Sequence, residues 1–300
     1  MHRRWRPDGP LSLQRVLGVH RRGRGDPTFA VEGSGAVWRT ARTPDGPGSV
    51  RFAVVDGEVA IDAHGPGAGW LCEHGPAWLG AEDDLTGFHP QHDLLREWSR
   101  RTGGPRIGRT GLVWEALVPA VLEQKVTGGE SRRAWRWLVR RHGEAAPGPV
   151  PTGMQVVPGP EVWAAIPSWD YHRAGVGPQR AATVVRAARL ARHLEPAAHL
   201  TPQQADALLR SVPGVGPWTS AEVRQRALGD PDAVSVGDAH VPRLVVHALT
   251  GEVSDSDERM LAVLEPYLGH RFRVQRLLEL ADVRTPRFGP RYRPLDHRAR

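Results

Sequence analysis

Apolar and polar positions alternate in the first ninety residues with the period of two that half-buried strands require. Residues 36–43 form one strand-like run, and 49–55 and 58–63 form two more on either side of an Asp-Gly pair at 56–57. An Asp-Gly pair between two such runs is a strong signal for a hairpin. The pattern predicts a small sheet with one or two helices, one of them over 70–79.

Helical spacing replaces this alternation from about residue 91. Apolar residues recur at three- and four-residue steps over 112–139, where Pro119 and the glycine pair at 128–129 are expected to break the helix. Residues 178–194 give a second amphipathic pattern. The C-terminal third of the chain is therefore expected to be helical as well, up to a proline- and arginine-rich end.

Capping signals place two further helix starts. Thr201 precedes a proline and is followed three residues later by Gln204, which together form a capping box. Ser254 or Ser256 is expected to cap the next helix, because acidic residues at 257–258 would occupy its first turn.

These elements predict an α+β protein. A small β-rich α/β domain is expected over 1–90, an all-helical domain over 91–284, and a basic irregular tail over 285–300. No apolar run is long enough to span a membrane and no signal-peptide segment follows the basic N-terminus, so we expect a cytoplasmic, nucleoid-associated protein. Cys72 is the single cysteine, which excludes an internal disulfide framework.

The chain is basic, with 40 Lys and Arg against 33 Asp and Glu and a net charge of +7. Lys125 is its only lysine. A basic chain favours polyanionic partners such as nucleic acid. Codon usage in a GC-rich genome is an equal explanation for so many arginines, so charge alone does not decide the function.

The most informative segment is 208–221, in which a helix end, a Pro-Gly-Val-Gly turn and a second helix opening at Pro217 follow one another. Gly214 and Gly216 permit backbone conformations and close approaches that a Cβ would block. Such a helix-hairpin-helix can bind a nucleic-acid backbone through free N–H groups without reading sequence. An ordinary pair of helices joined by a glycine-rich turn is the alternative.

A second signal lies downstream, where the short apolar run 234–236 ends in Gly237 and Asp238 before a helix expected from Val241 to Leu249. A carboxylate just before a helix start is stabilised as the anion. By itself, Asp238 is as consistent with a simple N-cap as with a catalytic residue.

Together the two segments resemble the helix-hairpin-helix DNA glycosylase superfamily, and within it the 3-methyladenine DNA glycosylase II type. The resemblance is carried by 213–220, by Gly237-Asp238 and by 117–125, which is similar to the helix that approaches the flipped-out nucleotide. It implies a monofunctional hydrolase that removes alkylated purines, of the 3-methyladenine and 7-methylguanine type, in base-excision repair. Its partner would be double-stranded DNA with damaged bases, bound by a monomer.

The resemblance also implies roles for individual residues. Asp238 would be catalytic, stabilising the oxocarbenium-like sugar, and Trp218 would line the base pocket. No cofactor is expected for the chemistry, although Na⁺ or K⁺ would bind backbone carbonyls of the hairpin. The expected DNA contacts are Gly214, Gly216, Thr219, Gln124 and Lys125, and the expected cation ligands are Arg210, Val212 and Val215.

Four positions depart from the superfamily's pattern. Glu222 stands where a second pocket aromatic is common, and it either attracts a cationic base in the pocket or faces solvent. Ala239 and His270 also replace aromatic residues, with His270 expected in the pocket. Lys125 replaces the apolar wedge. Since lyases of this superfamily place a lysine next to the position of Trp218, its absence there implies hydrolysis without lyase chemistry.

Other hypotheses remain open at this point. The chain is also consistent with a non-catalytic DNA-damage-binding module, or with a glycosylase for deaminated bases such as hypoxanthine. Arginines of 132–141, interleaved with Trp135 and Trp137, form either a strand-contacting face or a solvated helix face. A zinc site would need the following set, whose spacing matches no familiar pattern: Cys72, His74, His89 and His92.

Overall fold

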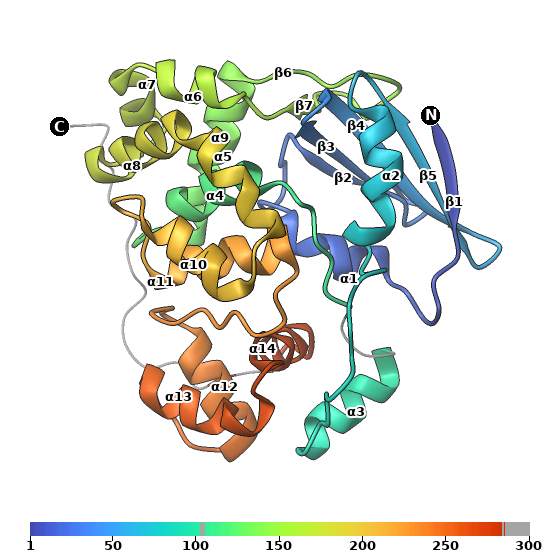
Figure 1. The fold of residues 1–300 in the computed structure, drawn as a ribbon, viewed down its shortest axis with the longest axis vertical. Coiled ribbons are helices and arrows are strands. Elements are labelled where there is room, and N and C mark those ends of the chain that lie inside the picture. The colour runs from blue at the N-terminus through green and yellow to red at the C-terminus, as the bar shows by residue number, and fades with distance from the viewer. Residues whose placement is uncertain (103–105, 284, 286–300) are drawn as a thin grey trace.

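A five-stranded antiparallel sheet forms the N-terminal part of the computed structural model, which describes residues 1–102, 106–283 and 285 (Figure 1). Its strand order is β1-β5-β4-β3-β2. The strands are β1 (His2–Trp5), β2 (Phe29–Val31), β3 (Val37–Thr43), β4 (Gly46–Val55) and β5 (Glu58–His64). The sheet predicted from the alternation is thus present, with β1 and β2 added at its edges.

The predicted hairpin joins β4 to β5. Val55 pairs with Glu58, which leaves Asp56 and Gly57 as a two-residue loop. Their φ angles are 52° and 78°, and both must be positive in the turn that matches the twist of the flanking strands. The Asp-Gly pair therefore sets the register of these two strands.

One apolar face of the sheet is covered by α2 (Ala68–Trp78), with α1 (Leu13–Leu17) alongside. Val50, Phe52 and Ile61 of the strands pack there with Leu71 and Trp78, and all five are almost completely buried. We call this hydrophobic cluster the sheet core. The short 3₁₀-helix η1 (Gly18–His20) follows α1 and leads toward the helical part of the molecule.

Helices of the middle of the chain surround a second cluster, the hairpin core. Helix α4 lies at its centre, since every residue of it except Glu115 is buried. The elements around this core are α4 (Val113–Leu122), α5 (Gly128–His142), α6 (Pro160–Ala165), α7 (Ser168–Arg173), α8 (Pro178–Arg189), α9 (Ala191–Leu194), η2 (Glu195–His199), α10 (Pro202–Arg210) and α11 (Pro217–Val223). A two-stranded ribbon, β6 (Glu144–Ala145) with β7 (Gln155–Val156), connects this region to the sheet.

The expected break at Pro119 is wrong. Helix α4 runs through this proline to Leu122, because burial on nearly all sides stabilises the helix beyond the cost of one missing N–H. The chain breaks instead at 123–127, and the glycine pair at 128–129 forms the first turn of α5. Thr127 and Glu130 make a capping box there.

A third cluster, the C-terminal core, lies at the opposite end of the helical part from the β6–β7 ribbon (Figure 1). It is formed by α12 (Val241–Thr250), α13 (Asp257–Leu264), η4 (Glu265–Tyr267) and α14 (Arg271–Leu280), joined by Leu95 from α3 (Asp93–Thr102). The helices expected over 91–284 therefore surround two hydrophobic cores, but the prediction of an all-helical region is wrong, because β6 and β7 pair within it. The division of the chain at residue 90 stays a prediction.

The capping predictions are confirmed. The Thr201 hydroxyl accepts a hydrogen bond from the Gln204 N–H and begins α10, and Ser256 rather than Ser254 caps α13 through the Arg259 N–H. The predicted tail falls outside the described residues, apart from Thr285. Within the described residues, no helix has the length and apolar character needed to cross a membrane.

Candidate active site

The turn between α10 and α11 has a backbone that only glycine can adopt. Gly214 has a φ of +98°, and a Cβ there would lie 2.2 Å from Thr183 Oγ1. The Val215 N–H donates to the Val212 carbonyl at 2.9 Å, which closes the turn. Gly216 then serves as the N-cap of α11. The helix-hairpin-helix predicted from 208–221 is therefore present.

Two side chains from other helices brace this turn. Gln124, just after α4, donates its amide N–H groups to the Gly214 carbonyl at 2.9 Å and to Thr219 Oγ1 at 2.8 Å. Arg186 of α8 donates to the Pro213 carbonyl. Because the Thr219 side chain is buried and bonded to Gln124, a DNA contact from Thr219 would have to use its backbone N–H.

Lys125 lies at the tip of the loop between α4 and α5. It is exposed, and its φ of 53° places its backbone in the left-handed region. It does not line the cavity described below. Its predicted contact with DNA is compatible with this exposed position and stays a prediction.

Asp238 precedes α12 and is held by three donors. The Trp218 indole Nε1–H donates to Oδ2 at 3.0 Å, whereas the backbone N–H groups of His240 and Val241 donate to Oδ1 at 2.7 and 3.0 Å. The carboxylate therefore caps the helix and also contacts the aromatic residue expected in the pocket. The N-cap residue of α12 is His240 rather than Asp238, whose side chain accepts hydrogen bonds from the first N–H groups of the helix, and the catalytic role of Asp238 stays a prediction.

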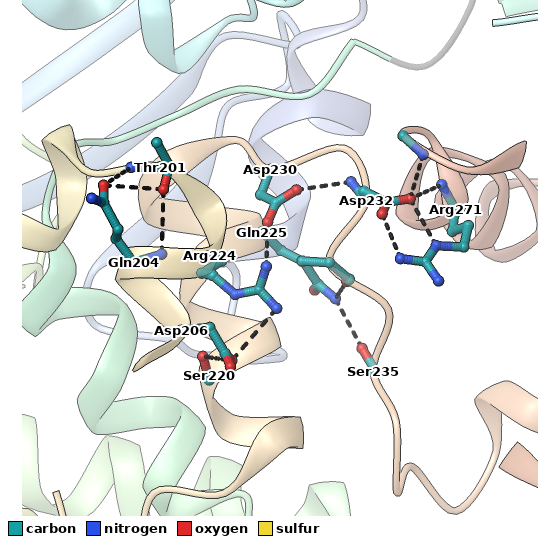
Figure 2. Close-up of polar contacts among 12 residues, drawn as sticks. Thr201, Gln204, Asp206, Ser220, Arg224, Gln225, Asp230, Asp232, Ser235 and Arg271 are labelled. Carbon is teal, nitrogen blue, oxygen red and sulfur yellow. Dashed lines mark hydrogen bonds and ion pairs between the residues drawn. The ribbon is translucent and has the colours of Figure 1, made fainter. Parts of the chain in front are cut away.

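The loop that carries Asp238 is anchored at its beginning by ion pairs (Figure 2). Arg224 pairs with Asp230, and Arg271 of α14 binds Asp232 through Nε and Nη2 at 2.8 and 2.5 Å. Gln225 donates to Ser235 Oγ at 2.9 Å farther along the same loop. These bonds position residues 230–235, the segment that leads to Asp238.

Asp238 faces a cavity of about 260 Å³ that is lined by residues of α1, η1, α11, η3 (Arg224–Leu228), α12 and α14 and of the loops between them. Trp218 and Glu222, both predicted for the base pocket, line the same cavity. Its full lining is Val16, Val19, Arg106, Ile107, Gly108, Glu123, Trp218, Glu222, Gln225, Arg226, Asp238, Val241, Phe272, Gln275, Arg276 and Glu279. Sequence-distant segments therefore meet at this one site.

Glu222 does not face solvent, since only 8% of the residue is exposed. Its Oε1 accepts from Ser235 Oγ at 2.8 Å and its Oε2 from Arg226 at 2.7 Å. Burial raises the pKa of this carboxyl, and Arg226 opposes the rise. Arg226 belongs to η3 (Arg224–Leu228), a π-helical turn after α11, a distortion that is frequent at functional sites.

The sequence predicted His270 in the base pocket, but the structure places it outside the cavity lining. It is the N-cap of α14, its ring packs 5.5 Å from that of Phe88, and Nε2 lies 3.0 Å from the Thr86 carbonyl. It is not among the residues that line the cavity. The helix begins only after His270, so the ring points toward the 86–88 loop.

The same helix nevertheless supplies four cavity residues that sequence reasoning missed: Phe272, Gln275, Arg276 and Glu279. They occupy positions i, i+3, i+4 and i+7 of α14 and therefore share one face. This spacing could have shown from the sequence that the four residues share a helix face, but not which part of the protein that face contacts.

The arginine-rich face of α5 is turned toward the N-terminal segment. Arg136 and Arg140 donate to the backbone carbonyls of Arg24 and Gly25, and the buried Trp135 donates to Asp26 at 3.0 Å. Arg136 and Arg140 therefore have hydrogen-bond partners within the protein, although Arg140 is exposed, and the two alternatives for this helix face stay predictions.

The zinc hypothesis is wrong for the residues that the structure describes, because no group of three or more His, Cys, Asp or Glu side chains is placed to hold a metal ion there. Cys72 is buried and faces the Ile61 carbonyl, and His74 stacks on Trp70. His92 lies instead against the Tyr267 hydroxyl.

Comparison with solved structures shows that this fold is similar to those of several DNA glycosylases. The 3-methyladenine DNA glycosylase from Archaeoglobus fulgidus aligns with a TM-score of 0.75 at 20% identity, covering 93% of this chain and 98% of that one. The 8-oxoguanine glycosylase/lyase from Clostridium acetobutylicum, in complex with double-stranded DNA, aligns with a TM-score of 0.70 at 13% identity, covering 93% and 96%.

A structure of MBOgg1 in complex with a low-affinity DNA ligand also has a TM-score of 0.70, at 16% identity and covering 92% of this chain and 93% of that one. No protein-family model matches the chain, and no curated protein matches it in sequence. The predicted resemblance is thus confirmed for the fold.

Proposed function

We propose that this chain is a monofunctional DNA glycosylase that hydrolyses the N-glycosidic bond of alkylated purines in duplex DNA, the first step of base-excision repair. The observation that carries the proposal is the position of Asp238, an aspartate on the wall of a base-sized cavity next to a helix-hairpin-helix. Neighbours of the same fold are named as DNA glycosylases, which supports the reaction class.

Asp238 acts on the sugar. When the N-glycosidic bond breaks, the deoxyribose develops the positive charge of an oxocarbenium ion, and a fixed carboxylate close to it lowers the energy of that transition state. The three donors to Asp238 hold the carboxylate in place, so little reorganisation is needed during the reaction. The same carboxylate can orient the water that attacks C1′.

The absence of lyase chemistry rests on the lysine count. A Schiff-base mechanism with a lysine requires its amine beside the sugar. Lys125 is the chain's only lysine, and it is exposed on the loop after α4 and not part of the cavity lining. Although one neighbour is named a glycosylase/lyase, this chain is proposed to stop at hydrolysis.

The cavity suits a base that has left the DNA stack. Trp218 and Phe272 offer aromatic surface from α11 and α14, on which an electron-poor alkylated purine stacks favourably. Extrusion costs a few kcal/mol and is cheapest for damaged bases that pair poorly. An alkylated purine also carries a good leaving group, so Asp238 does not need a strong general acid beside it.

The hairpin is proposed to bind the DNA backbone, with Gly214, Gly216 and Thr219 offering main-chain groups. A monovalent cation would be held by the carbonyls of Arg210, Val212 and Val215. These fit the ion because the turn's backbone is fixed by the buried Val212 and Val215 side chains, and a carbonyl that accepts one hydrogen bond, as Val212 does, keeps a second lone pair. The ion would supply positive charge that favours a DNA phosphate at the turn.

Release of free bases from methylated duplex DNA, resolved by chromatography, tests the proposal. We expect 3-methyladenine or 7-methylguanine from the parent protein and none above background from Asp238→Asn, with DNA binding retained by both. Equal release by the two proteins would remove Asp238 from the mechanism. Binding without release from any substrate, including hypoxanthine- and 8-oxoguanine-containing DNA, would identify a DNA-binding module.

A further inference from the structure

Glu222 is one of the carboxylates that line the cavity besides Asp238, and the reaction proposed above gives it no role. It lies four residues after Trp218 on α11, so the two side chains share one face of the helix. Both line the cavity. A buried carboxylate is costly unless it is paired, so a Glu at this position needs a physical reason.

The hydrogen bonds around Glu222 fix it as an acceptor. Ser235 Oγ receives the amide N–H groups of Gln225 and Gln275 at 2.9 and 3.3 Å. With those bonds accepted, its single proton points at Glu222 Oε1. Arg226 donates to the other oxygen, Oε2. An ionised carboxylate accepts about four hydrogen bonds, so two positions remain for a ligand in the cavity.

The charge of the cavity favours a cation. Each arginine that lines it has a carboxylate partner, and Glu123 is paired with Arg22. Asp238, in contrast, is bound only by an indole and backbone N–H groups among its described contacts. The formal sum of the lining groups and their ion-pair partners is one negative charge. The pairs are Arg226–Glu222, Arg276–Glu279, Arg22–Glu123 and Arg106–Asp8.

We propose that Glu222 is the specificity-determining residue of this cavity, accepting the N–H donors of an N-alkylated purine cation such as 7-methylguanine in preference to a neutral purine. This inference rests on the proposed function and deepens it. The adjacent N1–H and N2–H donors of guanine match the two oxygens of a carboxylate, and N7-alkylation adds the positive charge. Burial raises the pKa of Glu222, and a cation bound beside it favours the ionised form, as Arg226 does.

Equilibrium binding of two nucleosides tests this without catalysis. 7-Methylguanosine and guanosine offer the same donors and differ by one methyl group and one charge. The titrations are made by calorimetry at a pH just below the N1 pKa of 7-methylguanosine, where it is a cation. We expect the parent to prefer 7-methylguanosine by about 10-fold or more, the size of a charge-assisted hydrogen bond.

In Glu222→Gln, which keeps the shape but removes the charge and one acceptor oxygen, guanosine binding should weaken and 7-methylguanosine binding should weaken more, so that the preference falls to within about twofold. Glu82→Gln is the matched control, because Glu82 is exposed, pairs with Arg109 and does not line the cavity; it should behave as the parent. A preference that persists in Glu222→Gln, or is absent from the parent, overturns the inference.

If Glu222→Gln does not fold, a second variant tests the role of Glu222. The double variant Glu222→Met with Arg226→Met replaces the ion pair by apolar chains of similar length, a change that is often neutral or stabilising. Its circular dichroism and melting temperature report folding, and its preference for 7-methylguanosine should also be lost. Retention of the preference in the folded double variant contradicts a role for Glu222.

Base release separates this inference from the proposed function. If the parent prefers 7-methylguanosine but releases no base from methylated DNA, the glycosylase proposal fails and the role of Glu222 in recognition stands. If the parent releases 7-methylguanine and Glu222→Gln releases 7-methylguanine and hypoxanthine in the parent's ratio, the glycosylase stands and the role of Glu222 fails.

Discussion

The hairpin turn and the cavity lie side by side on α11, yet they are built in opposite ways. The turn is made by consecutive residues and depends on backbone geometry, above all on Gly214 with its φ of +98°. The cavity is made by side chains from segments up to 263 residues apart, such as Val16 and Glu279, and depends on charge and hydrogen bonding.

We infer from this difference that the hairpin contacts the DNA backbone and the cavity recognises the base. Main-chain groups at a turn are the same whatever the DNA sequence, so the hairpin suits contacts with the backbone of any DNA. A cavity of side chains distinguishes one base from another, because each carboxylate and amide in it fixes a donor or acceptor. Changes in one region should therefore leave the other's property intact.

The largest expected effect is on catalysis by Asp238. Asp238→Asn keeps an oxygen for the helix-capping N–H groups but removes the charge that stabilises the sugar cation. We expect single-turnover base release to fall by about 10²- to 10³-fold, as for loss of one fixed electrostatic group, with DNA affinity unchanged within about twofold. Anisotropy titrations provide the second measurement, and a parallel loss of affinity would mean that the two regions are not separable.

Gly214→Ala should have the opposite effect, weakening DNA binding while binding in the cavity persists. A Cβ there is forced into a left-handed backbone and overlaps Thr183, so the free energy of unfolding should fall by about 2–4 kcal/mol and the hairpin should shift. Affinity for duplex DNA should fall while nucleoside binding in the cavity persists. Gly153→Ala is the control: it has a φ of +83° with open space around it, and it should lose only about 1 kcal/mol.

Glu115 is a carboxylate with a buried side chain outside the cavity, so replacing it tests whether burial of a carboxylate anywhere in the protein affects binding in the cavity. Its side chain is as buried as that of Glu222, with 6% against 10% exposed, but it pairs with Arg39 and lies outside the cavity lining. Burial raises its pKa from 4.5 to about 7. Between these pH values the folded protein holds a proton that the unfolded chain releases, so this group's contribution to stability falls as the pH rises.

The free energy of unfolding of the parent, relative to Glu115→Gln, should therefore decrease between pH 4.5 and about 7, by on the order of 1–3 kcal/mol. Chemical denaturation at several pH values measures this difference. Nucleoside preference should not change in Glu115→Gln. Parallel pH profiles for the two proteins would show that Glu115 is ionised throughout the folded state.

The smallest expected effect concerns Gln124, which sequence reasoning assigned to DNA contact and the structure places as a brace of the hairpin. Gln124→Ala should lower the free energy of unfolding by about 1–2 kcal/mol and weaken DNA binding only a few-fold. Gln203→Ala, an exposed glutamine of α10, is the control. Unchanged stability with a smaller dependence of affinity on salt would indicate a direct phosphate contact instead.

The sequence by itself determined the local elements of this protein. The hairpin at 56–57, the cap at Thr201 and the turn at 213–216 follow from the conformations that a few neighbouring residues permit, whereas the sequence left the next cap open between Ser254 and Ser256. Asp238 could be placed before a helix for the same reason. Such features need no knowledge of the rest of the chain, because their hydrogen bonds close within a few residues.

Only the tertiary structure decided which side chains share the cavity. Periodicity places Phe272 and Gln275 on one face of a helix but does not say that this face meets Trp218 and Asp238, and it did not exclude His270. The helix continues through Pro119 for a similar reason. These outcomes depend on burial against distant segments, and the free energy of that packing outweighs local preference.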